Sequence, residues 1–418
     1  MVALKLLVFA HTPPPHHGQS YMVKLMLDGL GGNEGGAVAQ LREAPGSAVV
    51  CYHVDARLSA DLEDVGQARL GKLLPLVRYC CRAWYYRFRH GVRHFYYIPA
   101  PSVRAPLYRD WIVMALCRPV FSRVIFHWHA SGLGTWLDAQ ARPWERWLSR
   151  LLLGRADLSL VLGDHYRQDV QGLSPKKVAL VPNGIPDPCP DFERAVWPRR
   201  LARSQIRAAL LSDTQPDAGT MRRAGEAPQV FRVLFLSTCA REKGVFDAVE
   251  AAAGLNRQLA QERAPWRVRL TVAGKFGREE DRQALTRILD RELNTAFASQ
   301  KLCDYVGFVN GAEKTRLYVE SDCFCFPTFY PFEVQPVSLL EAMAFGLPVV
   351  TTRWRGLPEF LPPGYPGVVD VGAPDQIAQA LRQAATAPPD HALRTHFQTH
   401  FTVERFMSRL VEALREVE

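Results

Sequence analysis

The chain has 418 residues, of which 48% are hydrophobic and 22% are charged, so it is too long for one compact core and fits two folded domains. This composition excludes a disordered chain. The formal net charge of +9 indicates attraction to nucleic acid, anionic lipid or a phosphate-bearing substrate, and the sequence has no RRM, zinc-finger or helix-turn-helix signature to support nucleic acid.

The chain starts with MVALKLLVFAHTPPPHHG, whose apolar run is short, contains Lys5 and lacks a small-residue cleavage site. We therefore expect a buried strand here and not a signal peptide. No apolar stretch reaches the roughly 18 residues of a membrane-spanning helix, so we expect none. The nine cysteines form no C-x-x-C pair or Cys/His array, which indicates that most are buried free thiols in a reducing compartment. We expect a cytoplasmic protein.

The first part of the chain alternates short apolar runs with helical patterns, which is typical of a parallel sheet covered by helices. Each apolar run ends in a loop rich in Pro, Gly, His or Asn. The expected strands are residues 4–10, 48–54, 94–98, 124–127, 158–162 and 178–181. We expect them to form a Rossmann-like domain over residues 1–186.

From residue 187 to 229 the pattern gives way to Pro, Arg, Ser and Asp, which predicts a linker with a basic insertion. A second alternation predicts another Rossmann-like domain over residues 230–399. Its expected strands lie in FRVLFLST, in VRLTVAGKFG and at 302–308, 323–326, 349–352 and 367–371. The last helix, about 400–418, has the length to pack back on the first domain. Two α/β domains joined by a linker make a cleft.

Two loops of the first domain carry distinctive residues at strand ends. In PPPHHGQS, Gly18 lies just before a helix, and in FHWHASG, His127 and His129 lie at the end of a strand. A glycine here lets the chain turn, and a histidine at a strand end is often a hydrogen-bonded structural residue. Taken alone, each loop is open to a structural or a functional role.

The stretch YPFEVQPVSLLEAMAFGLPVVTTRWRGLPE, residues 330–359, is the most informative part of the chain. It places Glu333 and Glu341 around the start of an apolar helix. A helix N-terminus exposes N–H groups that suit a phosphate, and the two acids suit hydroxyls. Glu341 lies between apolar residues, so its carboxylate needs a partner to offset desolvation. The segment predicts a pocket for a nucleotide-activated sugar.

This segment is similar to the E-x7-E signature of the retaining glycosyltransferase group 1 family (glycosyltransferase family 4-like), whose members have the GT-B fold. The resemblance implies an α/β protein in which two Rossmann-like domains have parallel sheets facing each other across a cleft. It also implies that Glu333 contacts hydroxyls of the donor sugar and that Glu341 holds the ribose of the nucleotide. The backbone N–H groups of Val337 and Ser338 would face the diphosphate.

Two positions depart from the family pattern. Many members carry Gly-Phe after the first Glu, whereas this chain has Val334-Gln335, so the contacts around the donor sugar and its identity stay open. The segment LFLSTCAREKGVFDAVEA resembles the family's strand followed by G-R-x-x-x-x-K-G, whose Lys and Arg neutralise the leaving β-phosphate. Lys243 matches the Lys, but Thr238 occupies the Arg position, and whether Arg241 supplies the missing charge is open.

Other loops match the family by position. VALVPNGI looks like its P-N-G-I/V-D hinge, a mostly structural motif. In the family, a glycine-containing loop after the first strand approaches the phosphate and the acceptor, as Gly18 would, and a histidine after a later strand contacts the transferred sugar. His129 fits that histidine slightly better than His127, and both stay open. Gly274 and Val306 end strands where the family's nucleotide base packs against backbone.

No DxD motif lies at the strand ends, which agrees with a transferase that uses a lysine and a helix dipole in place of Mg²⁺. The resemblance implies a retaining hexosyltransferase that needs no metal or other cofactor and takes a nucleoside-diphosphate sugar as co-substrate. We expect it to act in cell-surface polysaccharide or glycolipid assembly. A nucleotide-sugar epimerase or phosphorylase on the same plan is the alternative. The sequence leaves the sugar, the nucleotide base, the acceptor and the oligomeric state open.

The segment RYCCRAWYYRFRHGVRH, residues 78–94, mixes aromatic residues with arginines at roughly helical spacing. One interpretation is a surface helix with one buried face. The other is an interfacial helix, with aromatic rings at the headgroup level and arginines on anionic lipid, which would make the protein peripheral on the inner face of the cytoplasmic membrane. The expected partners are the sugar donor, a glycan or lipid-linked acceptor and this anionic membrane surface, but no nucleic acid.

Overall fold

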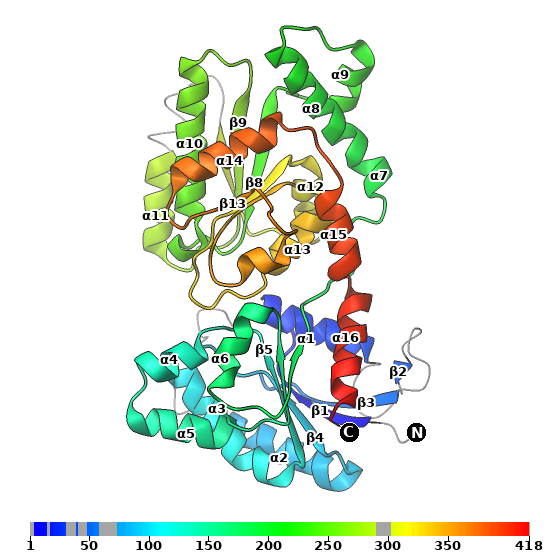
Figure 1. The fold of residues 1–418 in the computed structure, drawn as a ribbon, viewed down its shortest axis with the longest axis vertical. Helices are drawn as coiled ribbons and strands as arrows, with labels where there is room; N and C mark the ends of the chain where they lie inside the picture. Colours follow the sequence, from blue (N-terminus) through cyan, green and yellow to red (C-terminus); the bar gives the residue numbers. More distant parts are fainter. Residues whose placement is uncertain are drawn as a thin grey trace. The chain divides into compact units, whose positions relative to one another are not determined.

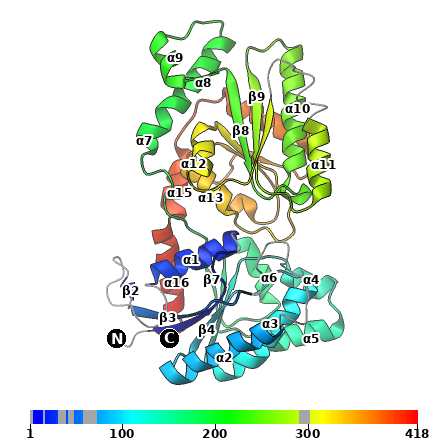
Figure 2. The same ribbon diagram turned by 180° about the vertical axis from the view of Figure 1, so that it is seen from behind.

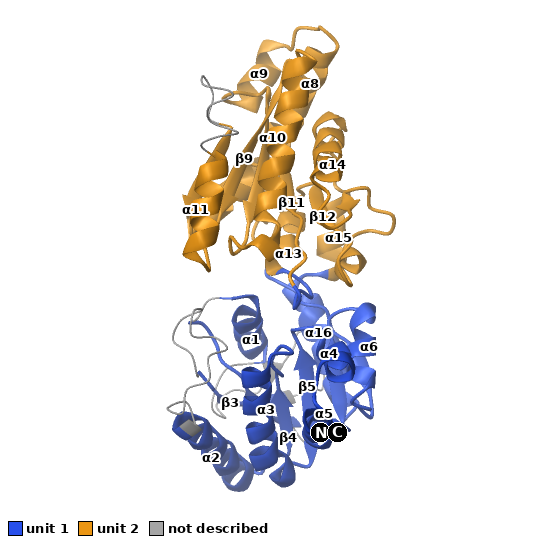
Figure 3. Cartoon of the chain, turned by 90° about the vertical axis from the view of Figure 1, so that its left-hand side faces the viewer, with its two compact units in different colours: residues 1–186, 331–336, 401–418 blue, residues 187–330, 337–400 orange. Residues whose placement is uncertain are grey.

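The computed structural model describes residues 4–14, 17–30, 39–40, 48–57, 73–289 and 302–417. The chain forms two compact units, each with its own sheet (Figure 3). Unit 1 comprises Met1–Pro186, Pro331–Pro336 and Phe401–Glu418, and unit 2 comprises Asp187–Tyr330 and Val337–His400. Segment 331–336, which carries Glu333, therefore belongs to a different unit from the helix that follows it.

Unit 1 contains a seven-stranded sheet in which neighbouring strands run parallel, except that β2 pairs antiparallel with β3. Its central strands are apolar along most of their length because helices cover both faces of a parallel sheet. In the order in which they pair, the strands are β2 (Ala39–Gln40), β3 (Ala48–Val54), β1 (Leu4–Phe9), β4 (His94–Tyr97), β5 (Arg123–Trp128), β6 (Leu158–Val161) and β7 (Val178–Leu180).

The helices of unit 1 divide between the two faces of this sheet. Because crossovers between parallel strands are right-handed, the connections that lead from β3 through β4 and β5 to β6 lie on the face opposite α1. On that face α2 packs against α3, and α3 packs against α5, whereas α1 contacts α16 (Figures 1 and 2). The helices are α1 (Gly18–Gly29), α2 (Leu73–His90), α3 (Arg104–Cys117), α4 (Leu133–Ala139), α5 (Pro143–Leu153), α6 (Arg167–Gln171) and α16 (Val403–Arg415).

Unit 2 contains a six-stranded parallel sheet. Its strands, in order of pairing, are β10 (Cys303–Gly307), β9 (Arg267–Ala273), β8 (Val230–Leu236), β11 (Cys323–Phe326), β12 (Val349–Thr352) and β13 (Val368–Val369). The helices are α7 (Phe192–Ala195), α8 (Trp197–Leu211), α9 (Ala218–Ala224), α10 (Val245–Gln261), α11 (Glu279–Ile288), α12 (Gly311–Glu320), α13 (Val337–Ala344), α14 (Pro374–Thr386) and α15 (Ala392–His400).

The predicted strands are present in both sheets, with small differences at their ends, and the predicted α/β class is confirmed. The two-residue strand β2 was not predicted, because so short a strand has no periodicity of its own. All nine cysteines are free thiols, and all except Cys81 are buried, as predicted for most of them. Within the described residues, no helix combines the length and the apolarity needed to cross a bilayer.

Residues 187–229 do not form the linker that their composition predicts. They contain α7, α8 and α9, belong to unit 2, and α8 packs against α9 (Figure 2). Arg203 is buried and its Nε donates to Asp322 Oδ1 at 2.7 Å. Arg200, also buried, donates from Nη1 to the carbonyl of Phe345 at 2.6 Å. The basic composition is misleading because these arginines bind buried acceptors and do not face water.

Candidate active site

The strand order of unit 2 changes direction at β8. Successive strands run from β8 to β9 and β10 on one side, and β11 then pairs on the other side of β8. Open α/β sheets bind ligands in the crevice outside the carboxyl ends of the strands at such a switch point. Lys243 follows β8, and the Glu341 segment follows β11, so the two strongest sequence motifs of unit 2 lie at this point.

Lys243 ends the short turn η5 (Arg241–Lys243), which leads into α10. Its Nζ lies 4.1 Å from the centre of the Tyr330 ring, in the loop after β11. The next residue, Gly244, has a φ of 82°, and a Cβ added there would overlap the carbonyl oxygen of Pro327. Only glycine allows so close an approach of the two loops. This approach positions the Lys243 side chain beside the loop that precedes α13.

Arg241 begins the same turn, and its guanidinium carbon lies 4.4 Å from the centre of the Phe246 ring on α10. Its side chain is exposed, as is that of Thr238, which occupies the family's arginine position. Two cationic side chains, Arg241 and Lys243, therefore project from one turn at the switch point.

Glu341 lies on α13 and is only 8% exposed. Lys314 Nζ donates to its Oε1 at 2.5 Å, and the Tyr318 hydroxyl donates to its Oε2 at 3.0 Å. Both partners lie on α12, one helical turn apart. Burial, and then the Glu341 carboxylate, raises the pKa of Tyr318 well above its usual value, so this hydroxyl stays a donor. The buried carboxylate thus has the partners that its apolar setting requires, and each oxygen keeps room for a second donor.

Val337 and Ser338 begin α13, and both are half-buried. The first N–H groups of a helix have no acceptor within the helix and carry a partial positive charge. The arrangement suits an anion at this end of α13, on the β11 side of the switch point.

The carboxyl ends of β9 and β10 present an aromatic surface. Gly274 directly follows β9 and has a φ of 149°, and an added Cβ would overlap the carbonyl oxygen of Ser237. Val306 lies at an irregularity of β10, and beyond it the Phe308 ring is 52% exposed. Lys275 Nζ lies 5.1 Å from the centre of that ring. A flat apolar group has an exposed ring to stack on here, close to the backbone of Gly274.

In unit 1, His127 and His129 lie at the carboxyl end of β5. His127 is fully buried, and its Nδ1 lies 2.5 Å from the Tyr96 hydroxyl and 3.3 Å from Nε2 of His129. Burial, and then His129, lowers the pKa of His127 well below its usual value. Burial, and then His17, lowers the pKa of His129 to about 3. Both rings are therefore neutral at neutral pH, and His129 is the less buried of the two.

Gly18 begins α1, and the residue before it caps this helix. The backbone N–H of Ser20 donates to Nδ1 of His17 at 3.3 Å, and Nε2 of His17 lies 2.9 Å from Nε2 of His11. The start of α1 thus lies among histidines at the carboxyl ends of β1 and β5. Among the residues that the structure describes, no group of three or more His, Cys, Asp or Glu side chains is arranged to hold a metal ion.

Segment 331–336 is part of unit 1 and is buried at Glu333, Val334 and Gln335. Ser131 Oγ donates to the Glu333 carbonyl at 3.3 Å, the Tyr166 hydroxyl donates to the Val334 carbonyl at 3.2 Å, and the Asn183 N–H donates to Gln335 Oε1 at 2.6 Å. Ser131 follows His129 by two residues, so the structure brings the FHWHASG loop and the Glu333 segment together. Asn183, from the expected hinge motif, holds the Gln335 side chain.

Sequence reasoning did not find several of these residues. Lys314 and Tyr318 do not belong to a recognisable sequence motif. Their spacing of one helical turn is the only feature of the sequence that links them. Ser131, in a loop, and Tyr166, in a short helical turn, likewise belong to no motif, and their hydrogen-bond acceptors lie far away in the sequence. Phe308 falls within the predicted strand 302–308 and was not predicted as a site residue.

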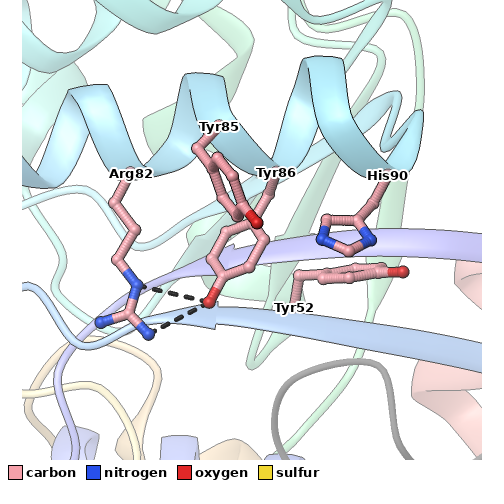
Figure 4. Close-up of a pocket in the computed structure, with 5 residues that line it drawn as sticks. All are labelled: Tyr52, Arg82, Tyr85, Tyr86 and His90. Atoms are coloured by element: carbon pink, nitrogen blue, oxygen red, sulfur yellow. Dashed lines mark hydrogen bonds between the residues drawn. The ribbon is translucent and has the colours of Figure 1, made fainter.

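A separate hollow of about 340 Å³ lies in unit 1 between α2 and β3 (Figure 4). It is lined by Tyr52, Arg82, Tyr85, Tyr86 and His90. Nε and Nη2 of Arg82 donate to the Tyr86 hydroxyl at 3.3 and 3.1 Å. None of the site residues predicted from the sequence lines this hollow.

Residues 230–387 match the protein family described as Glycosyl transferases group 1. The chain is 28% identical over 242 residues to the amylovoran biosynthesis glycosyltransferase AmsK of Erwinia amylovora, which covers 53% of this chain and 54% of that protein. It is 29% identical over 179 residues to the putative colanic acid biosynthesis glycosyltransferase WcaL of Salmonella typhimurium, covering 40% and 39% of the two chains. The matches span about half or less of these relatives.

Solved structures resemble the chain over nearly its whole length. Sucrose-phosphate synthase from Thermosynechococcus elongatus has a TM-score of 0.63 at 15% identity, with 99% of both chains covered. HepE of Anabaena, in complex with UDP and glucose, has a TM-score of 0.61 at 16% identity, with 99% of this chain and 100% of that one covered. These likenesses show the α/β two-domain GT-B fold.

Proposed function

We propose that this protein is a retaining glycosyltransferase that moves a sugar from a nucleoside-diphosphate sugar to an acceptor hydroxyl without a metal ion. The observation that carries the proposal lies in unit 2, where Lys243 and the first turn of α13 follow the two strands that flank the switch point. Departure of the nucleoside diphosphate builds negative charge on its β-phosphate. An ammonium group and a helix N-terminus stabilise that charge as it forms.

We assign binding of the nucleotide to other residues of unit 2. The Glu341 carboxylate accepts from Lys314 and Tyr318 and still has acceptor capacity for two ribose hydroxyls. The backbone at Gly274 and Val306, with the exposed Phe308 ring, receives the base. Arg241 adds positive charge near Lys243, in place of the family arginine that is Thr238 here.

In unit 1 we assign the transferred sugar to the loop of His129 and to the Glu333 segment, which lie together. The neutral ring of His129 contacts the sugar, and the buried His127 positions that ring. Glu333 accepts from sugar hydroxyls, and the replacement of Gly-Phe by Val334-Gln335 shapes the choice of sugar. Gly18, at the start of α1, is assigned to donor binding on the resemblance of its loop alone.

The reaction breaks the bond between the anomeric carbon and the β-phosphate oxygen and forms one between that carbon and the acceptor oxygen. The acceptor hydroxyl attacks from the face that the leaving group vacates, which retains the anomeric configuration. The proton of the hydroxyl passes to the departing phosphate. The names of the relatives, which refer to amylovoran and colanic acid biosynthesis, support assembly of a cell-surface polysaccharide or glycolipid as the context.

The test is sugar transfer, measured with UDP-, GDP- and ADP-sugars and a panel of glycan and lipid-linked acceptors. Removal of one preorganised charge that acts on the leaving group costs about 10²–10³ in kcat, so Lys243→Ala should lose about that much. Lys24→Ala, which removes an exposed lysine from α1, is the control and should keep full activity. Full activity in Lys243→Ala would remove the proposed role.

Two further readouts separate this proposal from an epimerase or a phosphorylase. A glycosyltransferase consumes the donor stoichiometrically with the acceptor. With no acceptor present, an epimerase isomerises the donor and a phosphorylase cleaves it with added inorganic phosphate. The anomeric configuration of the product, read by NMR, decides between retention and inversion. Added EDTA should leave the rate unchanged, and a rate that requires Mg²⁺ or Mn²⁺ would refute the metal-independent step.

A further inference from the structure

Helix α2 of unit 1 exposes a row of apolar side chains. Leu74, Val77, Tyr85 and Phe88 are all exposed, and Leu74 and Phe88 are 79% and 70% accessible. Together with the exposed Cys81, they recur every three or four residues, which places them on one side of an α-helix. The opposite side, with Leu76, Cys80 and Ala83, is buried. A row of this length on a water-facing side indicates a surface that contacts something less polar than water.

The same helix is strongly basic. It contains Arg78, Arg82, Arg87 and Arg89, and it has no Asp or Glu from Leu73 to His90. Arg78, Arg82 and Arg89 are exposed beside the apolar row, whereas Arg87 donates to the carbonyl of Val120. The exposed side of α2 is therefore apolar and cationic at once.

Helix α5 repeats this pattern. Trp144, Trp147 and Leu151 are exposed at a spacing of three and four residues, and Trp147 is 65% accessible. Arg146 and Arg150 lie on the same helix, and its single acid, Glu145, is completely buried. Exposed tryptophans beside arginines are typical of side chains at the interface of a lipid bilayer.

Helix α3 joins these two helices into one layer, because it packs against both (Figure 3). It contributes Arg104 and Arg109, and its acid, Asp110, is buried against Arg109. Glu145 of α5 is likewise paired with Arg104, and its carboxylate has no exposure. Within these three helices the acids are thus neutralised in the interior, and the outward charge is positive.

We propose that the exposed residues of α2 and α5, which we call the outer helix face (Leu74, Val77, Tyr85, Phe88, Trp144, Trp147 and Leu151, with their flanking arginines), dock on an anionic lipid bilayer. Aromatic rings enter the headgroup region and arginines bind lipid phosphates. Charge complementarity favours a lipid surface over a protein partner, since the face combines exposed positive charge with two tryptophans and no exposed acid on α2, α3 or α5. The proposal does not depend on sugar transfer.

The hollow in Figure 4 lies beside this face and shares Arg82 and Tyr85 with it. The rings of Tyr52 and His90 lie 5.0 Å apart within it, so the hollow has aromatic walls. A guanidinium next to such walls suits the phosphate of a headgroup. The hollow is thus the part of the outer helix face where a lipid headgroup would enter.

The test is cosedimentation of the whole protein with vesicles of phosphatidylglycerol and phosphatidylcholine, compared with vesicles of phosphatidylcholine alone. Binding should require the anionic lipid and should weaken as salt is added. Each arginine near an anionic surface contributes about fivefold to partitioning, so Arg78→Gln with Arg89→Gln should lower it about 25-fold. Tyr85→Ser with Phe88→Ser should lower it about tenfold or more, because two rings no longer enter the interface.

Matched controls come from exposed residues outside this layer. Arg222→Gln with Arg415→Gln removes the same charge, and Leu211→Ser with Met221→Ser removes exposed apolar groups. Both pairs should bind vesicles like the parent protein. Equal loss in the Arg222/Arg415 pair would show that only net charge matters and would overturn the proposal. The proposal would also be overturned if light scattering showed a dimer that Tyr85→Ser with Phe88→Ser converts to a monomer, since a second copy of the chain would then cover the outer helix face.

Discussion

The carboxylate of Asp322, at the start of β11, holds α8 to the sheet of unit 2. Arg203 donates to Asp322 Oδ1 at 2.7 Å, Arg207 lies 3.5 Å from Oδ2, and the N–H of Arg232 donates to Oδ2 at 3.0 Å. The side chains of Asp322, Arg203 and Arg207 are nearly inaccessible to water. Asp322→Asn keeps the shape of the side chain and removes the charge that two buried guanidinium groups require.

The loss should be large, because removal of one partner from a buried ion pair costs about 3–5 kcal/mol. For a domain of this size that corresponds to a drop of roughly 6–20 °C in melting temperature. Burial raises the pKa of Asp322, but Arg203 and Arg207 more than offset this and keep it below its usual value. The stabilisation is therefore complete above the unfolded pKa of about 3.9 and is lost as the pH falls through the folded value.

The assay is thermal unfolding by circular dichroism at neutral pH. The matched control is Asp191→Asn, which breaks the exposed pair of Asp191 and Arg194, 2.7 Å apart, and should change the stability by less than about 1 kcal/mol. If the melting temperature of Asp322→Asn is no lower than that of Asp191→Asn, the buried ion pair does not stabilise unit 2. The assignment of α8 to the core of that unit would then be wrong.

Three further outcomes are expected. Because burial lowers the pKa of His129 to about 3, the unfolded chain binds a proton at this histidine at a higher pH than the folded chain does. The free energy of unfolding should therefore decrease below about pH 6.5, by about 2 kcal/mol at pH 5. In melting curves recorded at several pH values, His129→Phe should reduce this dependence on pH. Gly244→Ala should displace Lys243 and lower the rate of sugar transfer strongly, with only a small decrease in melting temperature. An unchanged transfer rate would argue against the close approach of the Gly244 turn to the Pro327 loop. Tyr318→Phe removes a donor to Glu341 and should weaken nucleotide binding by about fivefold to tenfold in calorimetry, with an unchanged affinity counting against the ribose site.

Much of the fold was predictable from local pattern. Apolar runs such as Leu4–Phe9 and Cys323–Phe326 are buried strands because both faces of a parallel sheet are covered, so the run carries its own signal. A glycine suits the turn before α10 because Gly244 has a positive φ, which glycine adopts without strain. Composition misled at residues 187–229, since whether an arginine is solvated or buried depends on where an acid such as Asp322 lies.

The candidate site was predictable only in part. The motifs of Lys243, Glu333 and Glu341 are visible in the sequence because they combine a charge with a strand end or a helix start, and the roles of these residues stay predictions. Their partners were not found, because the contacts of Glu341 with α12 and of segment 331–336 with unit 1 join parts of the chain far apart in sequence.

The sequence by itself determined which segments become strands and helices and which loops carry charge, because hydrophobic period, turn residues and helix starts are local properties. Only the tertiary structure decided which side chains meet. In the structure, Lys314 and Tyr318 donate hydrogen bonds to the Glu341 carboxylate, and Glu333 belongs to unit 1. His129 is less buried than His127. The physical reason is that burial and hydrogen bonding between distant residues depend on strand order and helix packing, which no local pattern encodes.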